Sequence, residues 1–82
     1  MSTYKARVSV MLKPGIADPQ GQTIERALPA LGFEGVGGVR VGKRIELEVE
    51  ASDPEGARAL VLEMCERLLA NPVIESYEVE IV

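Results

Sequence analysis

Histidine and tryptophan are absent from this 82-residue sequence, and cysteine occurs once, at Cys65. A single cysteine cannot form an internal disulfide, which is typical of a protein kept in a reducing cytoplasm. Zinc, haem and histidine-based acid–base sites draw mainly on histidine and cysteine side chains. The composition therefore disfavours enzymes of those classes, and we expect this chain to bind no metal and no cofactor.

Long apolar segments are missing as well. No apolar run approaches the roughly 18 residues that a membrane span requires. The first eight residues lack the unbroken apolar stretch of a signal peptide, and the net charge of −4 disfavours nucleic acid as the main partner. We expect a cytoplasmic protein that binds neither membrane nor nucleic acid.

The length predicts a single domain over residues 1–82. A core this small is modest, and oligomerisation is a common way to bury more surface. Charge is unevenly divided: residues 1–41 carry five basic and three acidic groups, whereas residues 42–82 carry four basic and ten acidic groups. This asymmetry indicates either two solvated faces of opposite sign or a docking patch.

Three segments alternate between apolar and polar residues, which predicts half-buried strands. They cover residues 5–13, 39–50 and 73–82. The inward positions are Ala6, Val8, Val10, Leu12, Val39, Val41, Ile45, Leu47, Val49, Val73, Tyr77, Val79 and Ile81. The middle segment contains Gly42-Lys43, and the alternation is compatible with one continuous strand or with a hairpin through a three-residue loop.

Lys43 has the parity of the inward positions in this segment. Either a local loop or bulge turns its side chain outward, or a partner takes it up.

Two segments have helical spacing. Asp18-Pro19 and Asp53-Pro54 each combine a good N-cap with proline at the first helical position. Pro29 is expected to kink or end the first helix, before a C-cap at Gly32. The second helix carries a wide apolar stripe, predicted to face the core: Ala57, Leu60, Val61, Met64, Cys65, Leu68 and Leu69.

The order strand, helix, long strand or hairpin, helix, strand predicts an α+β two-layer sandwich related to the ferredoxin-like fold. We expect both helices to cover one face of a small sheet, because each strand has only one apolar face. The other face carries Glu46, Glu48 and Glu50 and is interpreted as solvated. Cys65 is interpreted as a core residue, so the residues alone indicate a small α+β domain without an obvious catalytic site.

Several segments resemble the small PurS subunit of phosphoribosylformylglycinamidine (FGAM) synthase. They are Leu12-Lys13-Pro14-Gly15, Asp18-Pro19-Gln20-Gly21, Leu31-Gly32-Phe33, residues 39–43, Ile45-Glu46-Leu47 and residues 65–75. The resemblance covers essentially the whole chain, and Asp-Pro-Gln-Gly together with Leu-Ala-Asn-Pro-Val-Ile-Glu makes it specific.

This resemblance implies a role in purine biosynthesis. The family's complex converts formylglycinamide ribonucleotide, glutamine and ATP into the amidine, glutamate, ADP and phosphate. It implies ATP and magnesium on a large subunit, ammonia release by a glutaminase subunit, and a small dimeric subunit without catalytic residues that bridges the two and helps ammonia transfer. The whole complex is a carbon–nitrogen ligase, and the sequence leaves open whether this chain by itself should be called an enzyme.

The residues expected to bind partner subunits are Asp18, Gln20, Gly21, Arg40, Lys43 and Arg44. The alternative function is that of a dimeric regulatory domain that binds a small molecule, because ferredoxin-like domains often pair to form ligand clefts.

Overall fold

A computed structural model describes all residues from 1 to 82. The elements follow in the order β1 (Ser2–Leu12), α1 (Pro19–Ala27), a short 3₁₀ helix (Pro29–Leu31), β2 (Gly42–Ala51), α2 (Pro54–Met64), a π-helical turn (Cys65–Leu69) and β3 (Glu75–Ile81). The α+β class and the element order predicted from the sequence are confirmed.

The three strands form one antiparallel sheet in the order β2-β1-β3. Val8, at the centre of β1, lies opposite Ile45 on one side and Val79 on the other. Val8 and Val79 are buried, as are Ala6 and Val10. Alternation along β1 therefore assigned its inner face correctly.

The middle segment forms one strand rather than a hairpin, and this strand starts at Gly42. Its pairing with β1 is unbroken, with Lys43 opposite Val10 and Arg44 opposite Ser9. The expected loop or bulge at Lys43 is therefore absent. Because directly opposite residues of an antiparallel pair share a face, Lys43 lies on the same side of the sheet as the buried Val10.

Both helices begin as predicted. The Asp18 carboxylate accepts a hydrogen bond from the Gly21 amide at 3.0 Å, and the Asp53 carboxylate accepts one from the Gly56 amide at 2.6 Å. Helix α1 ends just before Pro29, where the predicted break occurs. The following 3₁₀ helix is capped by Gly32, which has a left-handed φ of 95°.

Helix α2 and the π-helical turn after it cover the apolar face of the sheet through one line of residues. Ala57, Val61 and Cys65 on this line are buried. The predicted stripe was too wide: Leu60 is 41% exposed and Leu68 is 83% exposed. A single helix contacts a sheet over only part of its circumference, so apolar positions on its flanks stay open within this chain.

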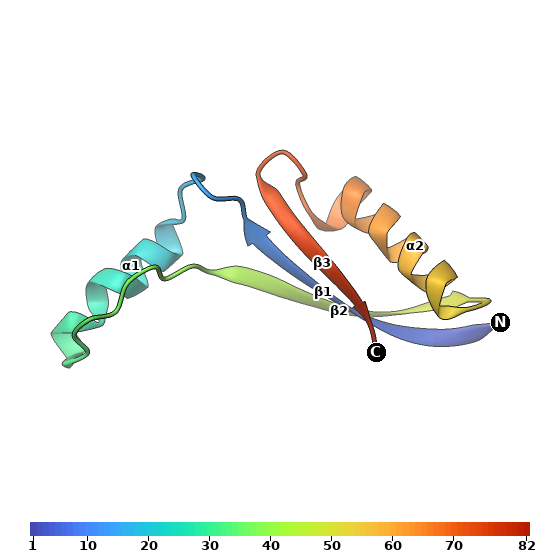
Figure 1. The fold of residues 1–82 in the computed structure, drawn as a ribbon, viewed down its shortest axis with the longest axis horizontal. Coiled ribbons are helices and arrows are strands. Elements are labelled where there is room, and N and C mark those ends of the chain that lie inside the picture. The colour runs from blue at the N-terminus through green and yellow to red at the C-terminus, as the bar shows by residue number, and fades with distance from the viewer.

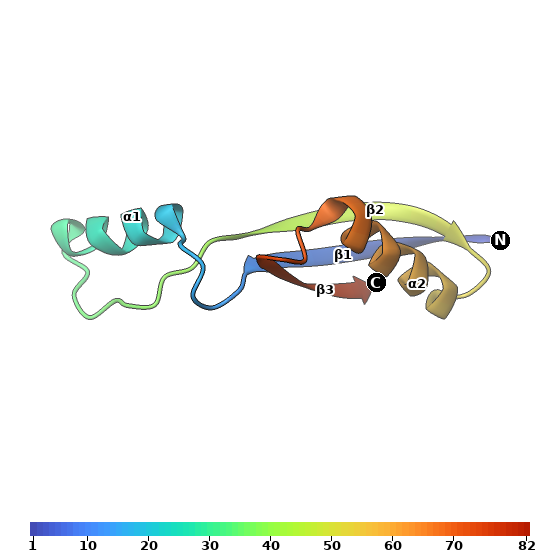
Figure 2. The ribbon, with the colours of Figure 1, turned by 90° about the horizontal axis from the view of Figure 1, so that it is seen from above.

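Helix α1 does not cover the sheet, which corrects the expected pair of covering helices. It projects beyond the end of the strands, together with the segment that returns to β2 (Figure 1). We call residues 16–41 the arm. Seen from above, the arm extends the long axis of the molecule away from α2 (Figure 2).

The arm makes the chain unusually long for its size. Its principal extents are 53 × 25 × 14 Å and its radius of gyration is 16.5 Å, compared with about 12 Å for a compact domain of this length. Several apolar side chains of the arm have little cover: Ile24, Leu31, Phe33 and Val36.

Candidate functional site

A hollow of about 300 Å³ lies where the arm leaves the sheet. We call it the arm-base hollow. Its walls come from the end of β1 and from the starts of α1, β2 and β3. The lining residues are Val10, Leu12, Asp18, Pro19, Gln20, Val41, Gly42, Lys43 and Glu75.

Asp18 joins the two chain segments at the base of the arm. One carboxylate oxygen accepts from the Gly21 amide at 3.0 Å, and the other accepts from the Val41 amide at 2.8 Å. These two hydrogen bonds, the one from Gly21 first, lower the pKa of Asp18, and the Arg40 guanidinium adds a smaller effect in the same direction. Asp18 therefore stays ionised and holds the start of α1 against the segment that enters β2.

Gly21 is buried because this segment passes directly over it. A Cβ atom at this position would lie 2.6 Å from the Val39 carbonyl oxygen. One turn later, the Glu25 carboxylate accepts a hydrogen bond from the Val39 amide at 2.9 Å. The arm is therefore clamped on itself, and the close approach at Gly21 comes from its own chain.

Lys43 and Gln20 stand at the same hollow with free side chains. Neither side chain makes a hydrogen bond or ion pair within the chain. The neighbouring Glu75 carboxylate accepts from the Asn71 amide at 2.6 Å. The hollow thus presents an unpaired ammonium group and an unpaired amide beside an apolar floor.

The two arginines of the expected docking set lie apart. Arg40 donates from its guanidinium to the Leu12 carbonyl, next to the hollow. Arg44 adjoins Lys43 in β2 and therefore points to the opposite face, where it pairs with Glu46 at 2.8 Å. The structure gathers Asp18, Gln20 and Lys43 in one hollow with Gly21 and Arg40 beside it, and it separates Arg44 from them.

Lys13 and Glu75 complete this region but were not singled out from the sequence. Lys13 donates from its ammonium to the Pro72 carbonyl at 2.7 Å, and its amide donates to the Ile74 carbonyl at 2.8 Å. The long-range pairing of β1 with β3 creates these contacts. Only the presence of both residues in the family-like segments could have pointed to them.

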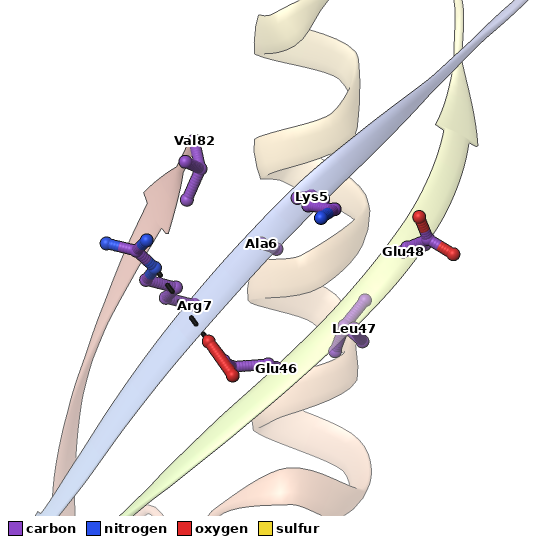
Figure 3. A pocket seen from close by; sticks show the side chains of 7 residues that line it. All are labelled: Lys5, Ala6, Arg7, Glu46, Leu47, Glu48 and Val82. Carbon is purple, nitrogen blue, oxygen red and sulfur yellow. Dashed lines mark ion pairs between the residues drawn. The ribbon is translucent and has the colours of Figure 1, made fainter.

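The outer face of the sheet is charged and open. A shallow hollow of about 250 Å³ lies there, and Figure 3 shows Arg7 and Lys5 of β1 beside Glu46 and Glu48 of β2. Arg7 pairs with Glu80 at 3.4 Å and with Glu46 at 3.9 Å, and all three side chains are largely exposed. Exposed pairs of this kind contribute about 0–1 kcal/mol, which agrees with the interpretation of a solvated face.

The remaining reactive side chains belong to the packing of α2. Cys65 is buried, and burial raises the pKa of its thiol, so the nucleophilic thiolate is disfavoured. The Tyr77 hydroxyl donates a hydrogen bond to the Glu66 carboxylate. No cluster of three potential ligand side chains is arranged to hold a metal ion, and none of the helices could span a bilayer.

Comparisons with known proteins agree on one family. Residues 5–82 match the PurS family profile, described as phosphoribosylformylglycinamidine (FGAM) synthase. The PurS subunit of Methanocaldococcus jannaschii FGAM synthase is 46% identical, over 95% of this chain and 94% of the relative. The Bacillus subtilis PurS subunit is 47% identical, over 95% of this chain and 92% of the relative.

Solved structures give the same result. A chain in the structure of PurLQS from Thermotoga maritima superposes with a TM-score of 0.90 at 43% identity, with 100% of both chains covered. The crystal structure of Methanocaldococcus jannaschii PurS superposes with a TM-score of 0.85 at 44% identity, covering 96% of this chain and 95% of that one.

Proposed function

Because the chain belongs to the PurS family, whose members are subunits of FGAM synthase in purine biosynthesis, we propose that it bridges the glutaminase and large synthetase subunits. In this role it has no catalytic residue of its own and helps ammonia pass from one subunit to the other. ATP and magnesium are held by the large subunit, and the complex works in the cytoplasm.

One observation carries this proposal. The whole chain superposes on a whole chain of an assembled synthase structure, PurLQS, at 43% identity. The arm is part of this match, although α1 does not pack on the sheet of the isolated chain. A segment that keeps its form without intramolecular cover is suited to contacts with other chains.

Reconstitution tests the proposal. The purified large and glutaminase subunits are mixed with and without this chain, and amidine formation is measured with glutamine and, separately, with ammonium salt. We expect glutamine-dependent synthesis to require the chain and ammonia-dependent synthesis by the large subunit to persist without it. Full glutamine-dependent activity in its absence would exclude the bridging role.

We also propose that two copies of the chain form a homodimer. Arg58 donates to the Val79 carbonyl of β3, so the opposite flank of α2, with Leu60 and Met64, faces β2. The inward residues of β2 beside this flank, Ile45, Leu47 and Val49, are only partly buried. Apolar side chains on this flank of α2 and on β2 are thus only partly covered, and the apolar side of a second copy's arm would cover them.

The charge order of β2 supports this pairing. Its outer edge is free of any strand in the chain. If two such edges pair antiparallel about Ile45, Arg44 of each copy lies opposite Glu46 of the other. Opposite charges stabilise cross-strand pairs, and a free edge is a template for a further strand. The same alignment carries each arm toward helix α2 of the other copy.

For the contact with the larger subunits, we propose the arm-base hollow. Gln20 and Lys43 have unpaired side chains there, and the Arg40 guanidinium lies beside them on the Leu12 carbonyl. Asp18 and Gly21 shape the hollow by clamping the arm. Arg44 lies on the other face of the sheet, where it contributes to the proposed pairing of two β2 edges.

A further inference from the structure

The surroundings of the arm-base hollow carry three cations without a carboxylate partner inside the chain. The Lys13 side chain donates to the Pro72 carbonyl, and the Arg40 side chain donates to the Leu12 carbonyl. The Lys43 ammonium has no hydrogen-bond or ion-pair partner. All four ion pairs of the molecule involve other basic residues: Arg7, Arg44 and Arg67. Carbonyl contacts position Lys13 and Arg40 but do not neutralise their charges.

The two acidic residues in the hollow are already engaged. Both carboxylate oxygens of Asp18 accept backbone amides, and Glu75 accepts the Asn71 amide. These hydrogen bonds fix loops of the chain and hold the carboxylates away from Lys43, which lies more than 4 Å from either. Lys13, Arg40 and Lys43 outnumber these two carboxylates by one, so the region carries a local excess of one positive charge in a chain whose net charge is −4.

Lys43 also stands in an unusual position for a lysine. It faces the apolar side of the sheet, opposite the buried Val10, and the hollow beside it is floored by Leu12 and Val41. When another chain covers this side, the ammonium loses water, and an unpaired charge removed from water is costly. A carboxylate from the covering chain would offset that cost.

We infer that the arm-base hollow receives an acidic side chain from another subunit of the synthase. Its carboxylate binds the Lys43 ammonium and the Gln20 amide, and its methylene groups lie on Leu12 and Val41. This inference rests on the proposed bridging function, to which it adds the chemistry of the contact. Such a contact fixes the register of the subunits and speeds their encounter.

Carbodiimide cross-linking of the assembled complex tests this directly, because the reagent activates a carboxylate, and a lysine amine in contact with it then forms an amide bond and releases the urea by-product. We expect mass spectrometry to find Lys43 joined to an aspartate or glutamate of the large or glutaminase subunit. A cross-link that joins Lys43 only to a second copy of this chain would overturn the inference, as would the absence of any Lys43 cross-link.

A charge reversal provides a second, independent test. Lys43→Glu is compared with Lys5→Glu, which makes the same charge change at an exposed site on the outer face. Breaking a covered charge pair costs enough that we expect at least about tenfold weaker binding to one larger subunit for Lys43→Glu, with little change for Lys5→Glu. Circular dichroism and the sedimentation mass of each variant check that fold and self-association are intact.

The outcomes separate the two proposals. If wild-type chain assembles and supports glutamine-dependent synthesis while Lys43→Glu does so equally well, only the acidic contact is overturned. If the wild-type chain does not assemble, the bridging function itself fails. The remaining alternative is that the hollow binds a small anion, which calorimetry with ATP, glutamate and inorganic phosphate tests. If one of these anions binds the isolated chain and Lys43→Glu abolishes that binding, the hollow is a small-anion site and the subunit contact is overturned.

Discussion

At the scale of single residues, the same short pattern has two different outcomes. Asp18-Pro19-Gln20-Gly21 and Asp53-Pro54-Glu55-Gly56 both start a helix with an aspartate cap and a glycine amide as donor. Local chemistry explains the caps equally well in both. The neighbours differ, because a returning backbone covers Gly21 and only side chains lie near Gly56.

This difference predicts opposite tolerance to alanine. In Gly21→Ala the new Cβ would meet the Val39 carbonyl oxygen at 2.6 Å, so we expect a loss of about 1–3 kcal/mol in the free energy of unfolding, as for overpacked sites. In Gly56→Ala the new Cβ would lie 3.0 Å from the Asp53 carboxylate and in ordinary contact with the Ala51 side chain, so we expect a stability within about 1 kcal/mol of wild type. Urea melts measure both, and equal losses would contradict the clamp.

Tyr77 gives a prediction for alkaline pH. The hydrogen bond to Glu66, then burial and the charge of Glu66, raise the pKa of Tyr77 to about 12, compared with about 10 for a free tyrosine. The folded state thus holds the proton more tightly. The protonated Tyr77 therefore stabilises the folded state fully below about pH 10, and this contribution to the free energy of unfolding is lost as pH rises toward 12.

Ultraviolet titration of the phenolate checks this prediction. We expect one of the two tyrosines to ionise only near pH 12, and Tyr77→Phe to remove that step. Glu66→Gln should move the step to lower pH, because it removes the negative charge that opposes ionisation. If the ionisation step that Tyr77→Phe removes lies near pH 10 instead of pH 12, the assignment is contradicted.

At the scale of elements, the two helices look alike in sequence but differ in what they pack against. Helix α2 buries Ala57 and Val61 against the sheet, whereas α1 leaves Ile24 and its neighbours open. The cause lies in the connections. Asp18 and Glu25 bind the return segment to α1, so the arm stands as one unit beyond the strands and does not fold back over them.

The exposed apolar flank of α2 predicts how this helix responds to substitution. Leu60 is 41% exposed on the flank that faces β2, so Leu60→Asp should leave the fold largely intact and weaken self-association by at least about tenfold, as expected for a charge in an apolar contact. Val73→Asp, at a site 80% exposed in the turn before β3, is the matched control. Sedimentation equilibrium measures both dimer constants; equal constants for the two variants would place the interface elsewhere.

At the scale of the whole molecule, the chain is extended rather than compact. A radius of gyration of 16.5 Å for 82 residues leaves much apolar surface uncovered, and only ten residues are buried. A monomer of this shape has a small core, which is consistent with a subunit that is completed by other chains. Its chemistry is therefore expected to appear only in the assembled synthase.

This view predicts the behaviour of the isolated protein. We expect no hydrolysis of glutamine or ATP and no amidine formation by the chain alone, because its one thiol is buried and kept protonated. Coupled assays for glutamate and ADP measure this. Glutamine turnover by a pure sample that disappears in Cys65→Ala would overturn the non-catalytic role.

The sequence by itself determined the α+β class, the inner face of β1, both helix starts, the break at Pro29 and the family. These features depend on alternation, capping and proline geometry, which act over a few residues, and on motifs that run along the whole chain. The tertiary structure alone decided that α1 leaves the sheet, that Leu60 lies on an open flank, and that Lys43 and Arg44 point to opposite faces of a regular strand. It also decided which predicted docking residues meet, because the arm-base hollow is built from Leu12, Gln20, Lys43 and Glu75, which only long-range pairing and the clamp at Asp18 bring together.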